Sequence, residues 1–438
     1  MVWTMSRDST VDADDAGAGA HAHGSPVPGV LVILDAGQPA AVPLALPPSG
    51  LELGRGLPDG LFADDEQVSR AHASVKLERD AVVVSDLGSR NGSFLDGVRL
   101  ERATGRVPPA LLRVGRSLLW IVPDVRPFAL GANAPSAARE QGPVLGGLLS
   151  RAFGEIALAA KAGDSVLIAG ESGAGKELAA RAFHEAYGDG DAPFVAVNCA
   201  AIPEGLAERL LFGSKRGAYS GALDSDGYLQ QAHGGTLFLD EIAELDPLVQ
   251  AKVLRVLETH EVLALGGTRP RTLNLRICAA SHKDLREEVG AGRFRADLYY
   301  RIGRPVVRIP PLRERIDEIP WLAQRALHAI DGALAPSAVL IERCALLPWP
   351  GNVRELQHEL RRAGHAAQEQ GVQLVQPEHL AADAGVALAS EPAVARAADI
   401  DEAAIAQALA EHDGNVTAAA RALGLHRNQL RRLLSKRE

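Results

Sequence analysis

Cysteine is scarce in this chain, and its distribution excludes folds that depend on cysteine chemistry. The 438 residues include three cysteines, Cys199, Cys278 and Cys344, each in a separate apolar segment. None has the closely spaced partner that a zinc site uses, and a secreted disulfide framework needs paired cysteines. We therefore expect reduced thiols in hydrophobic cores and a cytoplasmic location.

Long apolar runs and a basic excess are also missing. No stretch approaches the roughly 18 uncharged apolar residues of a membrane helix, and no basic segment followed by a hydrophobic core opens the chain. We therefore expect no membrane association and no secretion. The formal net charge of −9 excludes a surface that coats nucleic acid uniformly, so any DNA contact should be confined to a local basic patch.

Shifts in composition divide the first part of the chain. Residues 1–28 are rich in Asp, Ala, Gly and His, lack periodicity, and are expected to be a disordered tail. Short alternating apolar runs separated by Gly, Asp and Pro turns predict an all-β sandwich over residues 29–125. A linker rich in Ala, Pro and Gly follows over residues 126–139.

The remainder predicts two further domains. Alternating strand and helix patterns over residues 140–318 indicate an α/β domain with a doubly wound parallel sheet, and residues 319–382 indicate a helical subdomain. A second linker, residues 383–399, precedes an all-α segment over residues 400–438.

The α/β domain begins with a phosphate-binding pattern. The apolar run Ser165–Ala169 leads into GESGAGKE, whose glycines leave backbone N–H groups free to surround phosphates. Lys176 can reach the β- and γ-phosphates of a nucleotide. The expected phosphate loop consists of Gly170, Glu171, Ser172, Gly173, Ala174, Gly175, Lys176 and Glu177.

A glycine-rich loop alone is often only a turn, but an acidic strand end follows it. The run TLFLDE brings Asp240 and Glu241 to the carboxyl end of a buried strand, where open α/β sheets bind ligands. We expect Asp240 to hold Mg²⁺ through its water shell, and Glu241 to position or deprotonate the attacking water. An isolated Asp-Glu pair is usually solvated, so the ordered combination with Lys176 carries the prediction.

Several ordered blocks between residues 140 and 382 carry a family resemblance. They are GESGAGKE, FVAVNCAAIPE, GAYSGA, GGTLFLDEI, FRADLYYRI, PPLRER and WPGNVRELQ. Together they resemble the AAA+ domain of bacterial enhancer-binding proteins, the ATPases that activate sigma-54 RNA polymerase. The resemblance implies ATP and Mg²⁺ as cofactors, and a homo-oligomer ranging from dimer to hexamer. It also makes Glu177, which stands where a generic phosphate loop has Ser or Thr, an expected metal-site residue.

The resemblance implies roles for residues outside the loop. Asn198 matches the residue that restrains the catalytic glutamate until the nucleotide state changes, although Asn before a buried cysteine can equally form a turn. Arg295 and Arg301 match arginines that a neighbouring subunit supplies, with structural ion pairing as the alternative. Arg354 matches the sensor arginine that contacts the γ-phosphate in its own chain. His282 stands where the family usually has a sensor Asn, and a neutral imidazole can donate and accept as an amide does.

The GAYSGA insertion departs from the usual family pattern GAFTGA. In the family this loop projects from the ATPase and touches the sigma factor, which implies sigma-54 RNA polymerase holoenzyme as a partner. Tyr219 in place of Phe keeps an aromatic body with one added hydroxyl, and Ser220 in place of Thr removes a methyl group. The loop consists of Gly217, Ala218, Tyr219, Ser220, Gly221 and Ala222.

The predicted sandwich carries the motifs LGRG, VSRAH and DLGSRNGSFLDG in that order. They resemble a forkhead-associated (FHA) domain, a phosphothreonine-binding sandwich. A phosphate dianion is bound by guanidinium, hydroxyl and amide donors that converge from loops, which Arg55, Ser69, Arg70 and Asn91 can supply. The ligand would be a phosphothreonine on a partner or on this protein, and either implies a serine/threonine kinase. The alternative is that these turn residues serve folding alone.

The last segment holds the local basic patch. Apolar positions recur at helical spacing from Ile400, with breaks at residues 413–415 and at Gly424, which predicts short helices ending in a helix-turn-helix. The segment resembles the Fis-type DNA-binding domain. A basic terminal helix can also be merely solvated, but this pattern indicates contacts to double-stranded DNA at an upstream, enhancer-like site. The expected contact residues are His426, Arg427, Asn428, Gln429, Arg431 and Arg432.

These patterns together predict a transcriptional activator. It would bind upstream DNA, assemble as an AAA+ ring, hydrolyse ATP to remodel sigma-54 RNA polymerase, and respond to phosphothreonine. Two alternatives keep the same fold. One is a phosphopeptide-responsive DNA-binding regulator or scaffold that no longer engages sigma-54, and the other is an ATP-dependent remodeller of a different complex.

Overall fold

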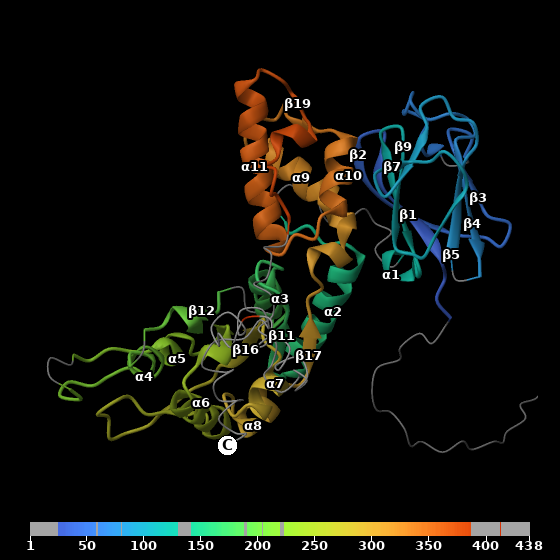
Figure 1. Ribbon diagram of the computed structural model, residues 1–438. Coiled ribbons are helices and arrows are strands. Elements are labelled where there is room, and N and C mark those ends of the chain that lie inside the picture. Colours follow the sequence, from blue (N-terminus) through green and yellow to red (C-terminus); the bar gives the residue numbers. More distant parts are fainter. Residues whose placement is uncertain are drawn as a thin grey trace, which may run out of the picture.

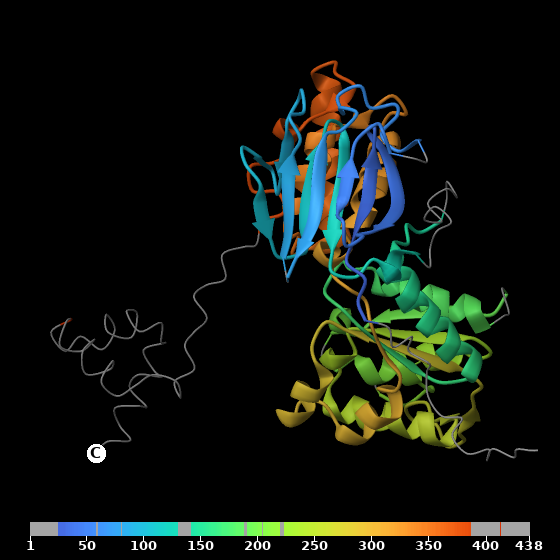
Figure 2. The ribbon, with the colours of Figure 1, turned by 90° about the vertical axis from the view of Figure 1, so that its right-hand side faces the viewer.

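The fold comprises a β-sandwich, a helical lid and an α/β layer (Figures 1 and 2). The computed structural model describes residues 25–386 apart from 58–59, 80, 130–141, 188–190, 204 and 220–222, together with His412. The segment up to residue 24, most of the first predicted linker, and the predicted helix-turn-helix lie outside the described residues. No helix within the described ranges combines the length and apolar composition needed to cross a membrane.

The sandwich consists of two antiparallel sheets, which confirms the predicted all-β class for this part. One sheet has the order β2-β1-β10-β9-β6-β7 and the other β3-β4-β5-β8. Inward-facing side chains such as Val32, Val84 and Leu119 form the core between them. The strands are β1 (Gly29–Asp35), β2 (Gln38–Ala45), β3 (Leu51–Leu53), β4 (Ala73–Glu78), β5 (Ala81–Asp86), β6 (Ser93–Leu95), β7 (Val98–Arg99), β8 (Thr104–Arg106), β9 (Ala110–Val114) and β10 (Ser117–Val122).

A short helix, α1 (Arg126–Ala129), stands where the sequence predicted the start of a linker. Phe128 of this helix packs edge-to-face on Trp120 of β10, with ring centroids 5.4 Å apart. This apolar contact holds α1 against the sandwich. The Ala- and Pro-rich composition that indicated a linker applies mainly to residues after 129.

The α/β layer contains a five-stranded parallel sheet of order β12-β13-β16-β11-β17, which confirms the predicted doubly wound class. Its strands are β11 (Val166–Ala169), β12 (Phe194–Asn198), β13 (Thr236–Asp240), β16 (Arg276–Ser281) and β17 (Val306–Arg308), with β14 (Glu261–Val262) and β15 (Arg271–Thr272) forming a separate antiparallel pair. Its helices are α2 (Gly147–Ala162), α3 (Lys176–Tyr187), α4 (Ala207–Phe212), α5 (Tyr228–Gln231), α6 (Pro247–Thr259), α7 (Leu285–Gly290) and α8 (Ala296–Ile302). The strands are apolar on both faces because helices cover both sides of a parallel sheet.

The lid is helical, as predicted, and adds one small parallel strand pair. It comprises α9 (Ile319–His328), α10 (Ala338–Leu346) and α11 (Asn352–Glu369), with β18 (Ala335–Pro336) and β19 (Leu374–Val375). Trp349 is fully buried at its centre and donates its indole N–H to the carbonyl of Cys344 over 2.6 Å. The cysteines are all buried and free, as predicted.

Candidate active site

The phosphate loop connects β11 to α3 at the carboxyl edge of the sheet. Gly173 and Gly175 have φ values of +72° and +106°, which L side chains rarely adopt. The ammonium of Lys176, at the first turn of α3, donates to the carbonyls of Gly170 (3.0 Å) and Glu171 (3.3 Å). It also lies 3.1 Å from a carboxylate oxygen of Glu241, so the predicted lysine and glutamate are brought together.

The acidic strand end lies beside this loop. Asp240 ends β13, and its carboxylate accepts a hydrogen bond from the backbone N–H of Glu241 over 3.1 Å. Burial, followed by the charge of Glu241, raises the pKa of Asp240. Burial also raises the pKa of Glu241, but hydrogen bonds from His282 and the charge of Lys176 outweigh it and leave that pKa below its ordinary value. Glu241 is therefore ionised at neutral pH.

His282 is the second partner of Glu241. Its Nδ1 lies 2.6 Å from the Glu241 Oε2, and its backbone N–H donates to the same oxygen over 3.1 Å. Because a carboxylate only accepts, Nδ1 carries the proton in this arrangement. The side chain of Asn198 accepts from the backbone N–H of Ala200 over 3.0 Å and so begins a 3-10 turn, and its restraint of Glu241 stays a prediction. That contact is the turn role weighed as the alternative.

The lid contacts the phosphate loop through Glu171. Arg313 donates two hydrogen bonds to the Glu171 carboxylate, at 2.9 and 2.7 Å, and the side chain of Asn352 donates to it over 3.1 Å. The hydrogen bonds from Arg313 lower the pKa of Glu171, and they outweigh burial, which acts to raise it. Gly173 permits this close approach, since a Cβ there would lie 2.3 Å from the carbonyl oxygen of Gly351. We call the Glu171–Arg313–Asn352 cluster the lid latch.

Arg354, the predicted sensor, also points toward the phosphate loop. Its guanidinium donates to the hydroxyl of Ser172 over 3.4 Å from the first turn of α11. The lid thus places a cation next to the loop that is expected to hold phosphates.

A segment that is buried except for Arg313 and Glu314, residues 312–318, connects the sheet to the lid. The guanidinium of Arg315 donates to the carbonyl of Ala174 in the phosphate loop over 2.5 Å and pairs with Glu318. Asp317 and Glu318 accept the backbone N–H groups of Gly147 (3.1 Å) and Gly146 (3.0 Å) at the start of α2. Burial raises the pKa of Asp317 to about 6 and that of Glu318 to about 7. We call residues 312–318 the hinge segment.

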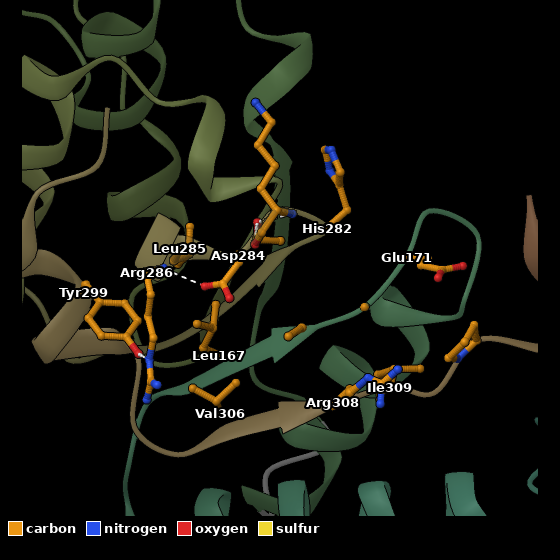
Figure 3. Close-up of a pocket in the computed structure, with 15 residues that line it drawn as sticks. Leu167, Glu171, His282, Asp284, Leu285, Arg286, Tyr299, Val306, Arg308 and Ile309 are labelled. Atoms are coloured by element: carbon orange, nitrogen blue, oxygen red, sulfur yellow. Dashed lines mark hydrogen bonds between the residues drawn. The ribbon is translucent and has the colours of Figure 1, made fainter. Parts of the chain in front are cut away.

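A cavity of about 410 Å³ lies at the carboxyl ends of β11, β16 and β17 (Figure 3). Glu171 and His282 line it from the phosphate-loop side, and Tyr299 and Arg286 line it from the other side. The Arg286 guanidinium donates to the Tyr299 hydroxyl over 2.8 Å. The cavity is continuous with the site because Gly170 and Glu171 belong to both.

The residues present fit a magnesium nucleotide. Mg²⁺ usually takes one or two carboxylates and completes its shell with phosphates and water, so it does not need a dedicated protein cage. Asp240 is partly buried, and among the described residues no group of three or more His, Cys, Asp or Glu side chains is placed to bind a metal. Glu177 lies in the first turn of α3 and pairs with Arg181 over 2.8 Å.

Arg295 immediately precedes α8, and Arg301 lies in the last turn of this helix. Arg295 pairs with Asp297 over 2.7 Å, and Arg301 donates to the carbonyl of Leu257 over 3.0 Å. Arg301 lines a cavity with residues 163–165 and 273–277, which precede or begin β11 and β16. It therefore faces the amino edge of the sheet, whereas the phosphate loop is at the carboxyl edge.

The GAYSGA insertion leaves the α/β layer after α4, on the side away from the sandwich (Figure 1). At its base, Ser214 and Ser225 form an antiparallel β-bridge. Gly266 packs closely on Ala218 there, because a Cβ added at Gly266 would lie 2.8 Å from the Ala218 Cβ. Tyr219 is exposed and accepts a hydrogen bond from Arg209 over 3.3 Å, so its added hydroxyl has a partner. Ser220, Gly221 and Ala222 lie outside the described residues.

The predicted phosphothreonine residues come together on sandwich loops. The Arg55 N–H donates to the Ser69 carbonyl (3.1 Å), the Ser69 hydroxyl accepts from the Arg90 N–H (3.3 Å), and the Asn91 amide donates to the Gln67 carbonyl (2.8 Å). Arg55, Arg70 and Asn91 are exposed.

Buried His72 supports these loops from below. Its Nδ1 accepts from the Ser69 N–H over 2.9 Å, which leaves Nε2 to donate to the Gly92 carbonyl over 3.2 Å. The hydrogen bonds of buried His72 thus hold the loops that carry the exposed donors.

Sequence reasoning assigned no role to Arg313, Arg315, Asn352, Asp317 or Glu318. The blocks PPLRER and WPGN contain several of them, but nothing in the spacing indicates that they meet the phosphate loop. The predicted DNA-contacting residues, His426, Arg427, Asn428, Gln429, Arg431 and Arg432, lie outside the described residues.

Comparison with protein families finds four matches along the chain. They are the FHA domain over residues 51–119, the sigma-54 interaction domain over 147–308, the AAA+ ATPase lid domain over 313–396, and the bacterial regulatory protein, Fis family, over 396–436.

Curated relatives are transcriptional regulators. The hydrogenase transcriptional regulatory protein HoxA of Bradyrhizobium diazoefficiens is 42% identical over 288 residues, covering 62% of this chain and 59% of HoxA. The response regulator PilR of Pseudomonas aeruginosa is 43% identical, covering 62% of this chain and 64% of PilR. The transcriptional regulatory protein ZraR of Salmonella typhimurium is 38% identical over 324 residues, covering 70% of this chain and 71% of ZraR. The chain thus spans less than two thirds of the first two.

A solved structure is similar to this chain in fold over most of its length. NtrX from Brucella abortus, crystallised in complex with ATP, matches with a TM-score of 0.51 and 26% identity, covering 71% of this chain and 73% of NtrX.

Proposed function

The chain belongs to the family of sigma-54-dependent transcriptional activators with AAA+ and Fis-type domains, and from this premise we propose that it hydrolyses ATP to remodel sigma-54 RNA polymerase. The observation that carries the proposal is the convergence of Lys176, Asp240 and Glu241 beside the phosphate loop. In this proposal the protein works in the cytoplasm, bound to upstream DNA through residues 396–436.

The Lys176–Glu241 pair defines a resting state that nucleotide would change. A triphosphate competes with Glu241 for the Lys176 ammonium, because it brings more negative charge to the same loop. Glu241 then leaves Lys176 while His282 still holds its other oxygen, at 2.6 Å in the resting state. A carboxylate held in this way is ionised and oriented to accept a hydrogen bond from the attacking water. Mg²⁺, held near Asp240 and Glu177, would supply positive charge beside the phosphate oxygens.

Arginines from a neighbouring subunit would complete the site. In the same chain Arg301 faces the edge of the sheet opposite the phosphate loop, so it serves a nucleotide only across a subunit interface. We propose an oligomer, up to a hexameric ring, whose interfaces bring Arg295 and Arg301 of one subunit to the next. Arg354, on the lid, would contact the γ-phosphate of the nucleotide bound to its own chain.

The FHA domain would recognise phosphothreonine through Arg55, Ser69, Arg70 and Asn91. A phosphate dianion suits this exposed set of guanidinium, hydroxyl and amide donors above buried His72. A serine/threonine kinase would create the ligand, on a partner or on this chain.

The deciding experiment measures open-complex formation on a sigma-54-dependent promoter with the full-length protein, with and without ATP. Glu241→Gln should abolish ATP hydrolysis and opening together. Tyr219→Ala should abolish opening while leaving hydrolysis within about twofold of wild type, because its side chain is exposed and lies outside the nucleotide site. Arg106→Ala, at an exposed ion pair of the sandwich, is the control and should change neither.

Each other outcome points to an alternative. Hydrolysis without opening by the wild-type protein would contradict the sigma-54 assignment and favour a remodeller of another complex. DNA binding without hydrolysis would favour a scaffold.

A further inference from the structure

One sheet of the sandwich is buried on both faces. In a two-layer sandwich, strands usually alternate between residues that face the core and residues that face water. In β1 and β10, however, the outward-facing Leu31, Ile33, Leu118 and Trp120 are as buried as their inward-facing neighbours. The opposite sheet keeps the alternation, and in β5 the partly exposed Val83 lies between the buried Val82 and Val84. The sequence shows the same contrast, because VLVIL and LLWIV are unbroken apolar runs.

The lid covers this outer face. Its buried cluster continues from Leu31 and Trp120 into Leu322 of α9 and Ile341 of α10. Helix α10 packs against β9 and β10, and α9 packs against β2. Figure 1 shows the six-stranded sheet between the lid and the four-stranded sheet, and Figure 2 shows the lid helices behind the sandwich.

A buried ion pair fixes the register of the two surfaces. Arg113 of β9 donates to the Glu342 carboxylate of α10 over 2.7 Å, with side chains 13% and 5% exposed. The Arg113 guanidinium also lies over the ring of Phe94 in β6, 3.9 Å from its centroid. Water solvates both charges when the surfaces separate, so the desolvation cost of docking offsets much of the Coulomb attraction of the pair. The pair therefore sets the register of the two surfaces, and the apolar burial around it supplies most of the stability.

The interface lies between the phosphothreonine loops and the nucleotide site. Phe94 follows Asn91 by three residues, so Arg113 stacks on the strand that leaves the phosphothreonine loop. On its other side the lid donates hydrogen bonds to the phosphate loop, from Asn352 to Glu171 and from Arg354 to Ser172. Arg313 of the hinge segment donates to the same Glu171.

We propose that the FHA sandwich and the lid form one rigid unit, and that phosphothreonine recognition regulates ATP hydrolysis by acting on the lid across the Arg113–Glu342 interface. The proposal builds on the proposed function. The sandwich moves with the lid about the hinge segment. Occupancy of the sandwich loops therefore biases how the lid latch and Arg354 close on nucleotide.

The first test separates docking from covalent connection. A protease recognition sequence is inserted between α1 and α2 of the full-length protein, the chain is cut, and the fragments are applied to a size-exclusion column. The wild-type fragments should elute together. Separate elution at micromolar concentration would overturn the proposal, and this readout needs neither ATP, DNA nor sigma-54.

Charge reversal then tests the named pair. Arg113→Glu should weaken fragment association at least about tenfold, and combining it with Glu342→Arg should recover part of the loss. Arg106→Glu reverses the charge of an exposed arginine on the same sandwich and should leave association unchanged. Equal association for Arg113→Glu and Arg106→Glu would contradict the role given to the pair, and recovery in the double variant excludes simple misfolding.

The regulatory part of the proposal is tested by nucleotide release from the uncut protein. Release of a fluorescent ADP analogue should change at least about threefold in Arg113→Glu, return toward wild type in the double variant, and stay unchanged in Arg106→Glu. Unchanged release in Arg113→Glu despite lost docking would overturn the regulation by the lid. A failure of ATP binding in the wild-type protein would instead count against the proposed ATPase.

Discussion

At the scale of single residues, the Glu241 carboxylate is held by groups that respond differently to nucleotide. Lys176 is the group that phosphates attract, whereas His282 lies beside the loop and keeps its contact with the other carboxylate oxygen. Glu241 also has a φ of +54°, which fixes the strand end in a conformation that residues with a Cβ rarely adopt. In the proposed ATPase, the positioning of the Glu241 carboxylate would therefore depend on His282.

Replacing His282 should lower turnover more than substrate binding. In His282→Ala the Glu241 carboxylate loses its shortest hydrogen bond, so kcat for ATP hydrolysis should fall about tenfold while KM changes less than about twofold. His282→Asn should retain most activity, because an amide can donate to the same oxygen. Steady-state ATPase assays give both constants.

Asn198→Ala provides the contrast. The Asn198 side chain caps the turn at residues 199–201 in the described structure, so its loss should reduce kcat less than the loss of His282. A larger effect for Asn198→Ala would restore the role that the family resemblance implies for Asn198 and contradict the assignment to His282.

At the scale of elements, the hinge segment concentrates buried charge at one junction. Arg315 stands between two buried carboxyl groups, Asp317 and Glu318, which also bind the backbone N–H groups at the start of α2. The same Arg315 holds a carbonyl of the phosphate loop. Helix α2, the phosphate loop and the lid therefore meet through side chains of one short segment, and the ionisation of this segment affects all three.

The Asp317 carboxyl should make stability depend on pH. Burial raises its pKa from 3.8 to about 6, so between these values the folded protein binds more protons than the unfolded chain. The free energy of unfolding should therefore fall as pH rises through this window, by about 3 kcal/mol for this group. Asp317→Asn removes the titrating carboxyl and should flatten that part of the stability profile. Denaturant unfolding at pH values about one unit apart, between pH 4 and pH 8, measures the profile.

An exposed carboxyl gives the matched control. Glu155 on α2 is about half exposed and pairs with the similarly exposed Arg151, so Glu155→Gln should leave the slope unchanged. An equal slope in wild type and Asp317→Asn would show that Asp317 does not titrate in this window.

At the scale of the whole molecule, local patterns predicted the elements but not the contacts between domains. The phosphate loop and the Asp240–Glu241 strand end follow from short spacing, because strand, loop and helix are contiguous in sequence. The lid latch joins Glu171 to Arg313 and Asn352 across more than a hundred residues, and no local pattern reports such a pairing. The unbroken apolar run LLWIV belongs to the sheet face that docks on the lid. From the sequence alone, such a run is equally well explained by a strand in the core of the sandwich, and only the structure shows that one of its faces lies outside that core.

Arg301 lies at the edge of the sheet opposite the phosphate loop, so the proposed oligomer can be tested by mixing two defective variants. Lys176→Ala removes the phosphate-binding ammonium and keeps Arg301, whereas Arg301→Ala keeps the phosphate loop and removes the arginine. Each variant alone should be nearly inactive, and an equal mixture should recover about a quarter of wild-type ATPase activity, the fraction of interfaces that combine both intact parts. Activity per subunit should also rise with protein concentration, because the interface forms by association. If the mixture stays inactive while both variants assemble as the wild type does, Arg301 does not act across the interface, and its hydrogen bond to the Leu257 carbonyl is then its whole role.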